Sequence, residues 1–299
     1  MSTVIEVLVN GLGLGAVYAL VGLGLALVYK ATRILNFAQG EFGTIPAWTA
    51  YVIMTGFQIG GDPDINRGRL WIATIVAIVV GAGLGVLVNT VVIRRLAAAS
   101  PVTSLVATAG VMILLVSLQI IIFEAKGRRF PRYIEGGFRM PGADVTVAWQ
   151  NVLILVVLAG AAALLALLFR TPAGVALLAT AQEPFAAELQ GVPIASMRTL
   201  AWAMAGALGA VAGMLGAGVF SSSFSPGLMT AVFLIPAFVG AVLGGIASMV
   251  GAVTGGLILG ITVAAANQIV RSLNVDVPGP PHVAVFLVLL LVLLVRPTG

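Results

Sequence analysis

The sequence predicts an all-α, polytopic integral membrane protein. Of its 299 residues, 60% are apolar and only 8% carry charge, which is about a third of the charged share of a soluble domain. The mean hydropathy is +1.15, and uncharged stretches long enough to cross a bilayer recur along the whole chain. These observations exclude soluble enzymes, nucleic-acid-binding domains and disordered proteins as interpretations of the whole chain.

About nine membrane segments are expected, with a range of eight to ten, and any of them can be a broken or re-entrant helix. Lipid offers no partners to backbone polar groups, so each uncharged run must be helical where lipid touches it. The expected segments cover residues 7–29, 37–57, 71–93, 101–123, 148–169, 199–220, 229–247, 250–270 and 282–296. Together they form a single transmembrane domain over residues 1–299.

The boundaries of these segments follow from charges and turn residues. The first has 23 uncharged residues after Glu6, and the absence of a basic start predicts that it is retained rather than cleaved. The next four runs each suit a single crossing of about 20 residues. The 72-residue uncharged run 199–270 suits three crossings, divided at 221–227 and 244–248, where Ser, Pro and Gly favour turns. The last segment follows the Pro-Gly-Pro-Pro stretch 278–281.

The net charge of +5 comes from a few Arg in the loops, and no run of five basic residues occurs. We therefore expect contact with the lipid bilayer and no nucleic-acid partner. Lys and Arg are almost equally numerous on the two sides of the predicted bundle, so the positive-inside rule does not decide the orientation. The chain has no Cys, which excludes disulfides, thiolate catalysis and Cys-ligated metals.

Glycines spaced four residues apart predict close packing between helices. The pairs are Gly209 with Gly213, Gly240 with Gly244, and Gly251 with Gly255, among others. Small residues one helical turn apart let backbones approach closely in lipid. A sharper interpretation is that these helices slide or rock during transport.

The first candidate site is the segment 36–41, Asn-Phe-Ala-Gln-Gly-Glu, between the first two apolar runs. A carboxylate such as Glu41 is costly beside a membrane segment and usually faces protein, water or a cation. Lys30 and Arg33 are near enough in sequence to pair with it. The segment is either a charged loop at the interface or a polar interruption that shapes the entrance of a pathway. In the second case Asn36, Phe37, Gln39 and Glu41 line that pathway.

A second set of polar residues lies near the end of the run 250–270. Asn267 and Gln268 could hydrogen-bond another helix or line a pore. Arg271 follows them, and the lone histidine, His282, comes after the proline-rich stretch. With no other histidine to join it, His282 is expected at the membrane interface rather than as a metal ligand.

The loop 170–198 has Arg at both ends and is the longest connection of this kind. Residues 174–189 predict one short helix, ended by the Gly-Val-Pro stretch 191–193. The loop is either a surface linker or a helix that docks on a soluble partner.

The sequence lacks the motifs that nucleotide hydrolysis, common hydrolases and proton-driven transport require. No Gly-Lys dipeptide occurs, so a phosphate-binding loop with its lysine is absent. Neither His-Glu-x-x-His nor Gly-x-Ser-x-Gly is present, and no row of intramembrane carboxylates suits a proton-driven pump. We expect no enzymatic activity, no metal site and no cofactor in this chain.

Five stretches resemble the branched-chain amino-acid permeases of bacterial ABC importers. They are Gly-Leu-Gly-Leu-Gly-Ala-Val-Tyr-Ala-Leu at 11–20, Asn-Phe-Ala-Gln-Gly-Glu at 36–41, Ala-Gln-Glu-Pro-Phe-Ala-Ala-Glu-Leu-Gln-Gly-Val at 181–192, the glycine-rich 242–257 and Leu-Val-Arg-Pro-Thr-Gly at 294–299. They span almost the whole chain in the family's order. The Asn-Phe-Ala-x-Gly-Glu element separates this family from the related sugar permeases.

The resemblance implies an all-helical permease half in the bacterial cytoplasmic (inner) membrane. Its partners would be a second homologous permease chain, two ATP-binding cassette subunits that bind ATP-Mg, and a periplasmic or lipid-anchored substrate-binding protein. The loop 170–198 would be cytoplasmic, with the amino terminus outside and the carboxyl terminus inside. The substrate would be a branched-chain or related small amino acid, moved inward by ATP-driven alternating access.

The resemblance also assigns the coupling to the ATPases. The residues implied are Ala181, Glu183, Ala187, Glu188 and Gly191, and bulky substitutions at Ala187 or Gly191 should uncouple ATPase activity from uptake. The family often has His at the position of Gln39, and Pro184 is unusual for it. Close relatives carry urea and short amides, so such a permease is one alternative. An ATPase-independent channel or secondary transporter is the other.

Overall fold

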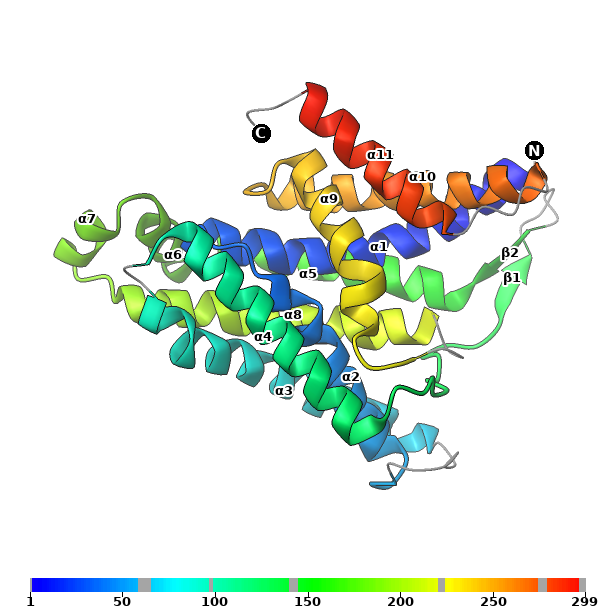
Figure 1. Cartoon of the computed structure of the whole chain (residues 1–299), viewed down its shortest axis with the longest axis horizontal. Coiled ribbons are helices and arrows are strands. Elements are labelled where there is room, and N and C mark those ends of the chain that lie inside the picture. Colours follow the sequence, from blue (N-terminus) through cyan, green and yellow to red (C-terminus); the bar gives the residue numbers. More distant parts are fainter. Residues whose placement is uncertain are drawn as a thin grey trace.

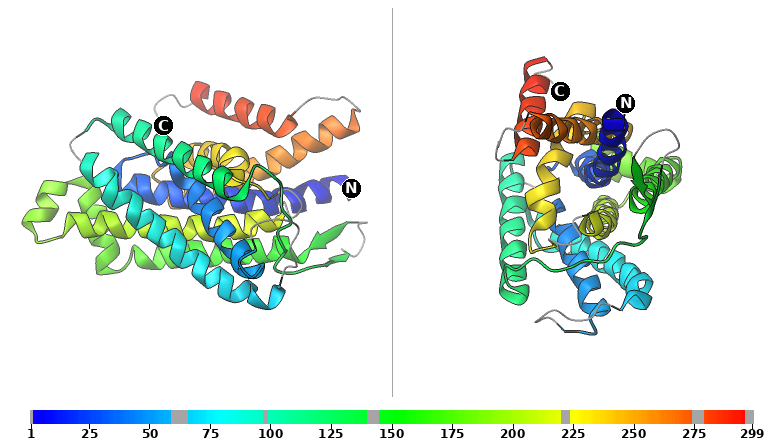
Figure 2. Two further views of the ribbon diagram at one scale, coloured as in Figure 1. Left: turned by 60° about the horizontal axis from the view of Figure 1, so that its bottom comes forward. Right: turned by 90° about the vertical axis from the view of Figure 1, so that its right-hand side faces the viewer.

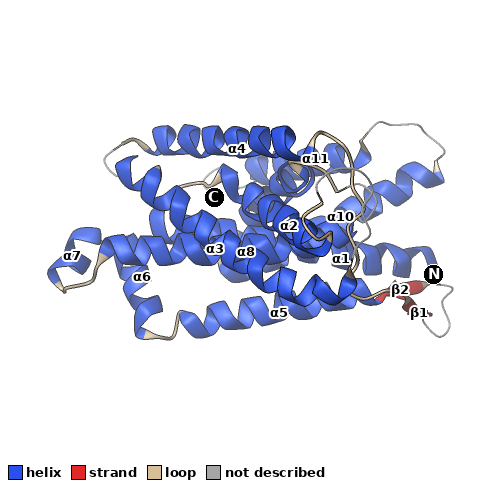
Figure 3. Ribbon diagram, turned by 90° about the horizontal axis from the view of Figure 1, so that it is seen from below, coloured by secondary structure: helices blue, strands red, loops and turns tan. Residues whose placement is uncertain are grey.

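The computed structural model describes residues 2–58, 66–96, 99–139, 145–219, 224–273 and 279–295. Parts of two predicted features, residues 221–223 of the first turn in the long run and residues 296–299 of the closing stretch, lie outside this description. Almost every element is a helix (Figure 3). The exception among the described residues is a two-stranded antiparallel sheet, β1 (Gly137–Arg139) with β2 (Thr146–Ala148), in which Gly137 pairs with Ala148.

Within the described ranges, six helices are long and apolar enough to cross a membrane. They are α1 (Ser2–Thr32), α3 (Leu70–Val91), α4 (Pro101–Phe123), α5 (Trp149–Leu168), α8 (Ile194–Val219) and α10 (Met249–Ser272). The shortest has 20 residues, which gives about 30 Å at the α-helical rise and matches the hydrocarbon core. The chain is therefore an all-helical membrane protein in its spanning part.

Three shorter helices fall within the other expected segments. α2 (Glu41–Met54) has 14 residues and α11 (Pro280–Val295) has 16. α9 (Ile235–Gly244) continues from a π-helix, η4 (Met229–Leu234). Each is about 21–24 Å long, less than the core of a bilayer. All nine expected segments contain a helix, but nine full crossings are not confirmed.

α1 is the central helix of the bundle. Its middle turns are buried on every side, and α5, α8, α9 and α10 pack around it. α4, α9 and α11 lie along one side of the molecule (Figure 2). Among the spanning helices that the structure describes, α1 at the centre is therefore the most buried, and α4 is largely exposed.

Glycines set the closest helix contacts in the structure. A Cβ built on Gly251 would overlap the carbonyl of Gly244, and the reverse holds as well. The other four glycines of the predicted pairs also face neighbouring helices: Gly240 and Gly255 face each other between α9 and α10, Gly209 faces Phe42 and Gly213 faces Gly43 between α8 and α2. Beyond these, α1 meets α10 at Gly15 and Gly260, and α3 meets α8 at Gly81 and Gly206.

The remaining elements lie at the ends of the bundle or in its connections. They are η1 (Phe37–Gln39), η2 (Arg67–Arg69), η3 (Ile93–Leu96), α6 (Pro172–Gln182) and α7 (Pro184–Leu189). The β1–β2 hairpin and the amino terminus lie at one end of the long axis, and α6 and α7 lie at the other (Figure 1). One end of the bundle therefore carries a hairpin and the amino terminus, and the other carries two short helices.

Candidate functional site

The segment 36–41 folds back from the end of α1 into the protein interior. The Asn36 side chain caps η1 by accepting a hydrogen bond from the Ala38 N–H at 3.1 Å. Its amide donates to Gln39 Oε1 at 3.1 Å, and Gln39 Nε2 donates to the Ala205 carbonyl of α8 at 2.9 Å. Asn36 and Gln39 are both buried. Gln39 is therefore fully engaged in holding this segment against α8.

Gly24 of α1 gives the Gln39 side chain its room. A Cβ at Gly24 would overlap the Gln39 amide. This observation explains why α1 carries a glycine at the level of the segment. The Gln39 amide, which belongs to η1, therefore contacts both α1 and α8.

Removal of the Gln39 amide is expected to destabilise the fold. In Gln39→Leu, the buried Asn36 Nδ2 loses its hydrogen-bond partner and the Ala205 carbonyl keeps only its bond within α8, which should lower the free energy of unfolding by about 1–3 kcal/mol. Thermal melting of the purified protein in mild detergent measures the change. The matched control is Gln58→Leu, because Gln58 is exposed and its replacement should shift stability by no more than about 0.5 kcal/mol. Equal melting of the two variants would contradict this role for Gln39.

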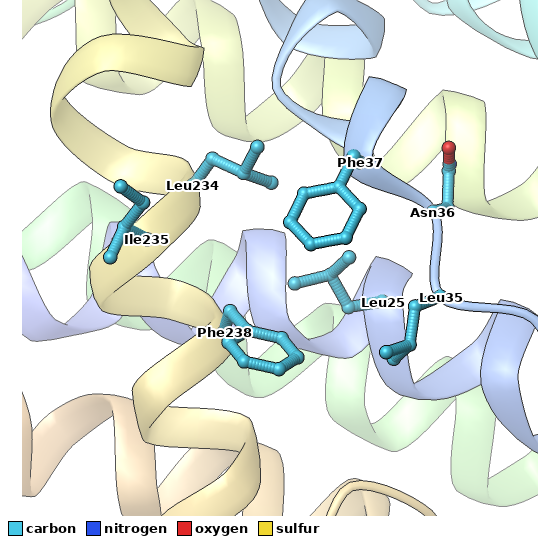
Figure 4. Close-up of a pocket in the computed structure, with 7 residues that line it drawn as sticks. All are labelled: Leu25, Leu35, Asn36, Phe37, Leu234, Ile235 and Phe238. Atoms are coloured by element: carbon cyan, nitrogen blue, oxygen red, sulfur yellow. The ribbon is translucent and has the colours of Figure 1, made fainter. Parts of the chain in front are cut away.

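Phe37 is positioned by α4 and faces α9. Its N–H donates to Thr108 Oγ1 at 3.3 Å, and the Thr108 hydroxyl donates to the Leu35 carbonyl at 3.0 Å. The Phe37 ring lies beside Phe238, with centroids 6.3 Å apart. Between them is a small apolar cavity of about 30 Å³, shown in Figure 4. It is lined by Leu25, Leu35, Asn36, Phe37, Leu234, Ile235 and Phe238.

Glu41, the first residue of α2, is completely buried. Gln119 of α4 donates a hydrogen bond from Nε2 to Glu41 Oε2. The hydroxyls of Thr44 and Thr230 lie beside the carboxylate. Glu41 Oε1 and Gln119 Oε1 are buried and have no hydrogen-bond partner among the described residues. This carboxylate can therefore accept a further donor.

The basic residues that were expected near Glu41 lie elsewhere. The Lys30 ammonium sits 4.9 Å from the centroid of the Phe169 ring, and the Arg33 guanidinium sits 5.7 Å from that of Tyr29. Within the described part of the chain, no Lys or Arg forms an ion pair with Glu41. The carboxylate is thus buried without a cationic side chain beside it.

The π-helix η4 packs directly on this site. A Cβ on Gly40 would overlap Thr230 Oγ1 and lie 2.8 Å from Thr230 Cα. The Met229 N–H donates to Thr44 Oγ1 at 3.2 Å. Single-turn π-helices are rare and occur frequently at functional sites. The start of α2 and the start of the η4–α9 helix therefore form one polar junction.

An apolar cavity of about 600 Å³ lies between α2 and α4 and reaches Gln119, the hydrogen-bond partner of Glu41. Its walls include Ile45, Trp48, Leu118 and Phe123, and Gln119 is part of its lining. The Trp48 and Phe123 rings stack with centroids 4.1 Å apart. The cavity has mostly apolar walls, and its polar lining includes Thr49 and the Gln119 amide that hydrogen-bonds Glu41.

Gln119 and Thr108 were not singled out in the sequence, although both contact the 36–41 segment. Both belong to the largely apolar run 101–123, whose other polar residues are Thr103, Ser104 and Ser117. The available signal was the presence of an amide near the end of a membrane helix, since such groups need a partner in lipid.

Asn267 and Gln268 are not brought to the 36–41 segment. They lie on α10 and line a cavity of about 140 Å³ together with Glu6, Asn10 and Arg271. The predicted pathway residues therefore fall into two separate places. Among the residues that the structure describes, no three His, Asp or Glu side chains gather as metal ligands would.

The loop 170–198 contains two helices, so the predicted single helix over 174–189 is wrong. α6 ends at Gln182 and α7 begins at Pro184. Proline disfavours the helical conformation of the residue before it, and Glu183 is accordingly extended, with φ −136° and ψ 82°. The chain bends at this point.

The residues implied in coupling differ in exposure. Ala181 is half-buried and Ala187 is buried against the fold, whereas Glu183 and Glu188 are exposed. Gly191 has φ +79° with no atom near a built Cβ, which is a conformation that suits glycine. Two large apolar side chains of α7 also point outward: Phe185 is 74% exposed and Leu189 is 73% exposed.

Comparison with known proteins gives consistent matches. The family model described as "Branched-chain amino acid transport system / permease component" matches residues 7–296. The chain is 31% identical to the "High-affinity branched-chain amino acid transport system permease protein BraD" of Pseudomonas aeruginosa, over 99% of this chain and 94% of that protein. It is 30% identical to LivH of Escherichia coli, which has the same description, over 97% of this chain and 92% of that protein.

A more distant relative is archaeal. The "Probable branched-chain amino acid transport permease protein LivH" of Methanocaldococcus jannaschii is 27% identical, over 81% of this chain and 75% of that protein. The chain matches no solved structure.

Proposed function

This chain belongs to the permease-component family of branched-chain amino acid transport systems, and from that premise we propose that it forms the membrane pathway of an ABC importer. It is a multi-pass membrane protein. In the proposal, it moves branched-chain or related small amino acids inward across the bacterial inner membrane by alternating access. ATP-Mg is bound and hydrolysed by two partner subunits, and a second permease chain completes the pathway. A periplasmic or lipid-anchored binding protein delivers the substrate.

The orientation follows from the two ends of the bundle. α6 and α7 lie at the end opposite the amino terminus and the β1–β2 hairpin (Figure 1). The exposed Phe185 and Leu189 side chains offer an apolar surface there. We assign this end to the cytoplasm, where the ATPases bind, and the amino terminus to the outside. Docking then depends chiefly on shape and apolar contact.

The observation that carries the substrate proposal is the buried carboxylate of Glu41. A buried carboxylate without a cationic neighbour is unfavourable in a membrane protein and is usually kept for function. Its Oε1 atom has no hydrogen-bond partner among the described residues, and Gln119, which donates to Oε2, lines an apolar cavity of about 600 Å³. An amino acid with an aliphatic side chain complements both the carboxylate and the apolar cavity. Its ammonium can bind Glu41 while its side chain contacts the apolar walls.

Replacement of Glu41 tests this proposal. The permease is reconstituted with its partner subunits in vesicles, and ATP-dependent uptake of labelled leucine is measured. Glu41→Gln keeps the size and a hydrogen-bonding amide but removes the charge, so uptake should fall about tenfold or more through loss of a charge-assisted hydrogen bond. Uptake at the wild-type rate would exclude recognition of the ammonium by Glu41.

The matched control is Glu124→Gln. Glu124 is at the surface, and the Lys126 ammonium, 2.8 Å away, holds the pKa of its carboxyl below the usual value. Its replacement should leave uptake unchanged. Two other results would favour the alternatives: uptake of urea or acetamide without leucine indicates an amide permease, and uptake without ATP indicates a channel or secondary transporter.

A further inference from the structure

A polar cavity lined by α1 and α10 adjoins an apolar cavity lined by α1, α10, α11 and the η4–α9 helix. Figure 1 shows that the carboxyl end of α10 lies near the amino terminus. The polar cavity has a volume of about 140 Å³, and the apolar one has about 480 Å³. Leu14 and Asn267 line both. Together these adjoining cavities, one polar and one apolar, are called the groove.

The face of α1 that lines the groove changes from polar to apolar along its length. Glu6 and Asn10 line the polar cavity, Leu14 lines both cavities and Tyr18 lines the apolar one. Residues four apart share one face of a helix. Glu6 and Tyr18 are thus separated by about 18 Å along the helix axis.

α10 shows the same change in the same direction. α10 runs opposite to α1 and contributes Arg271 to the polar cavity, Asn267 to both and Val263 to the apolar cavity. α11 begins at Pro280 and lines only the apolar cavity, with His282 in its first turn and Phe286 and Leu289 further along. α1 and α10 are thus polar at the end of the bundle and apolar further in.

The dimensions of this groove match one leaflet of a bilayer. Half of the hydrocarbon core is about 15 Å thick, close to the distance over which α1 and α10 change character. A ligand that fills the groove must be charged at the end of the bundle and apolar along its remaining length. A phospholipid has this form, with its headgroup at the surface and its acyl chains directed inward.

The charges at the polar end indicate the kind of headgroup. Glu6 and Arg271 line the same small cavity, and no ion pair joins these two described side chains. One carboxylate and one guanidinium complement a zwitterion, since guanidinium groups bind phosphate and carboxylates bind ammonium. We propose that the groove binds a zwitterionic phospholipid, with its phosphate on Arg271, its ammonium on Glu6 and one acyl chain in the apolar cavity.

The test measures the phosphatidylethanolamine that remains with the transporter. The assembled complex is purified from membranes in mild detergent, and the bound lipid is counted per permease by mass spectrometry. Arg271→Gln should lower the retained phosphatidylethanolamine about tenfold, the effect of losing a hydrogen bond to a charged group. The matched control is Arg139→Gln on β1, an exposed arginine at the same end of the molecule, which should retain the wild-type amount.

Two further variants test recognition of the lipid headgroup and of its acyl chain separately. Glu6→Gln removes the partner of the ammonium but keeps Arg271, so the retained lipid should shift from phosphatidylethanolamine to phosphatidylglycerol. Val263→Trp fills the apolar cavity and leaves both charges, so it should release the lipid while melting of the complex shows that the fold is kept. If Val263→Trp does not fold, Leu289→Trp provides the same test from α11.

Three results would overturn the proposal. The first is equal retention of phosphatidylethanolamine in Arg271→Gln and Arg139→Gln. The second is displacement of the lipid by millimolar leucine, which would make the groove an amino-acid site. The third uses Phe286→Cys, a position 60% exposed in a chain without cysteine: crosslinking to the second permease instead of to a photoreactive phosphatidylethanolamine would show that protein covers the groove.

Discussion

Replacement of Gly251 by leucine is expected to prevent accumulation of the folded permease. The Cα of Gly251 faces the carbonyl of Gly244, and a Cβ at either position would overlap the other backbone. The side chain cannot move aside because the contact is between two backbones. Overpacking of a well-packed interior costs about 1–3 kcal/mol, and we expect the upper end of that range or more here. Detergent extraction followed by thermal melting measures the loss.

The matched control for this substitution is Gly83→Leu. Gly83 also lies within a long helix, α3, but no atom lies within 4 Å of a Cβ built on it. The same change in helix propensity and apolar surface is then made without a clash. Gly83→Leu should melt at or above the wild-type temperature. Similar melting of Gly251→Leu and the wild type would show that α9 and α10 are not held by this contact.

Introduction of aspartate at Phe185 and Leu189 is expected to separate the permease from its ATPases. These side chains are exposed at the end of the bundle and lie one helical turn apart on α7. If they enter an apolar site on the ATPase, two buried unpaired carboxylates should weaken binding more than a hundredfold, at about 2 kcal/mol or more each. Copurification of the ATPase subunits and leucine uptake should both be lost.

The control for the α7 variant is Thr171→Asp, which adds charge at the same end of the bundle. Thr171 caps α6 through its side chain, and aspartate is an equally good cap. ATPase binding should therefore persist in this variant. Substitutions at Ala187 and Gly191 are less informative, because Ala187 is buried and Gly191 has a positive φ. Retention of the ATPases by the double aspartate variant would place the docking surface elsewhere.

Hydropathy predicts where the helices of this protein lie but not how long they are. The first residues of the segment expected at 37–57 form η1, because the Asn36 side chain caps that turn. α2 begins only at Glu41. The segment expected at 229–247 starts as a π-helix and ends at Gly245, where φ is +90°. Both features depend on local backbone geometry, which an average over uncharged residues does not contain.

The candidate site is predictable in part. The polar residues of the 36–41 segment stand out against their apolar surroundings, but the sequence does not show that Gln39 bonds to Ala205 or that Gln119 bonds to Glu41. These contacts join residues far apart in the chain, and they depend on how α4 and α8 cross the segment. The glycine spacing likewise predicts close packing without naming the partner helix. Pro184 also stands in the sequence, and it is the reason why the predicted helix over 174–189 divides at Glu183.

The glycine contacts have a mechanical consequence for this protein. They join the helices into two bodies, α1 with α9 and α10 and α2 with α3 and α8, which pack on each other through α1 and α8. A change of shape that keeps the glycine contacts within each body would be a displacement of one body against the other at the α1–α8 contact. The Gln39 side chain lies at the seam, next to Gly24 of the first body and bonded to Ala205 of the second. A measurement of the distance between α3 and α10 would therefore report the whole displacement, whereas one between α9 and α10 would stay constant.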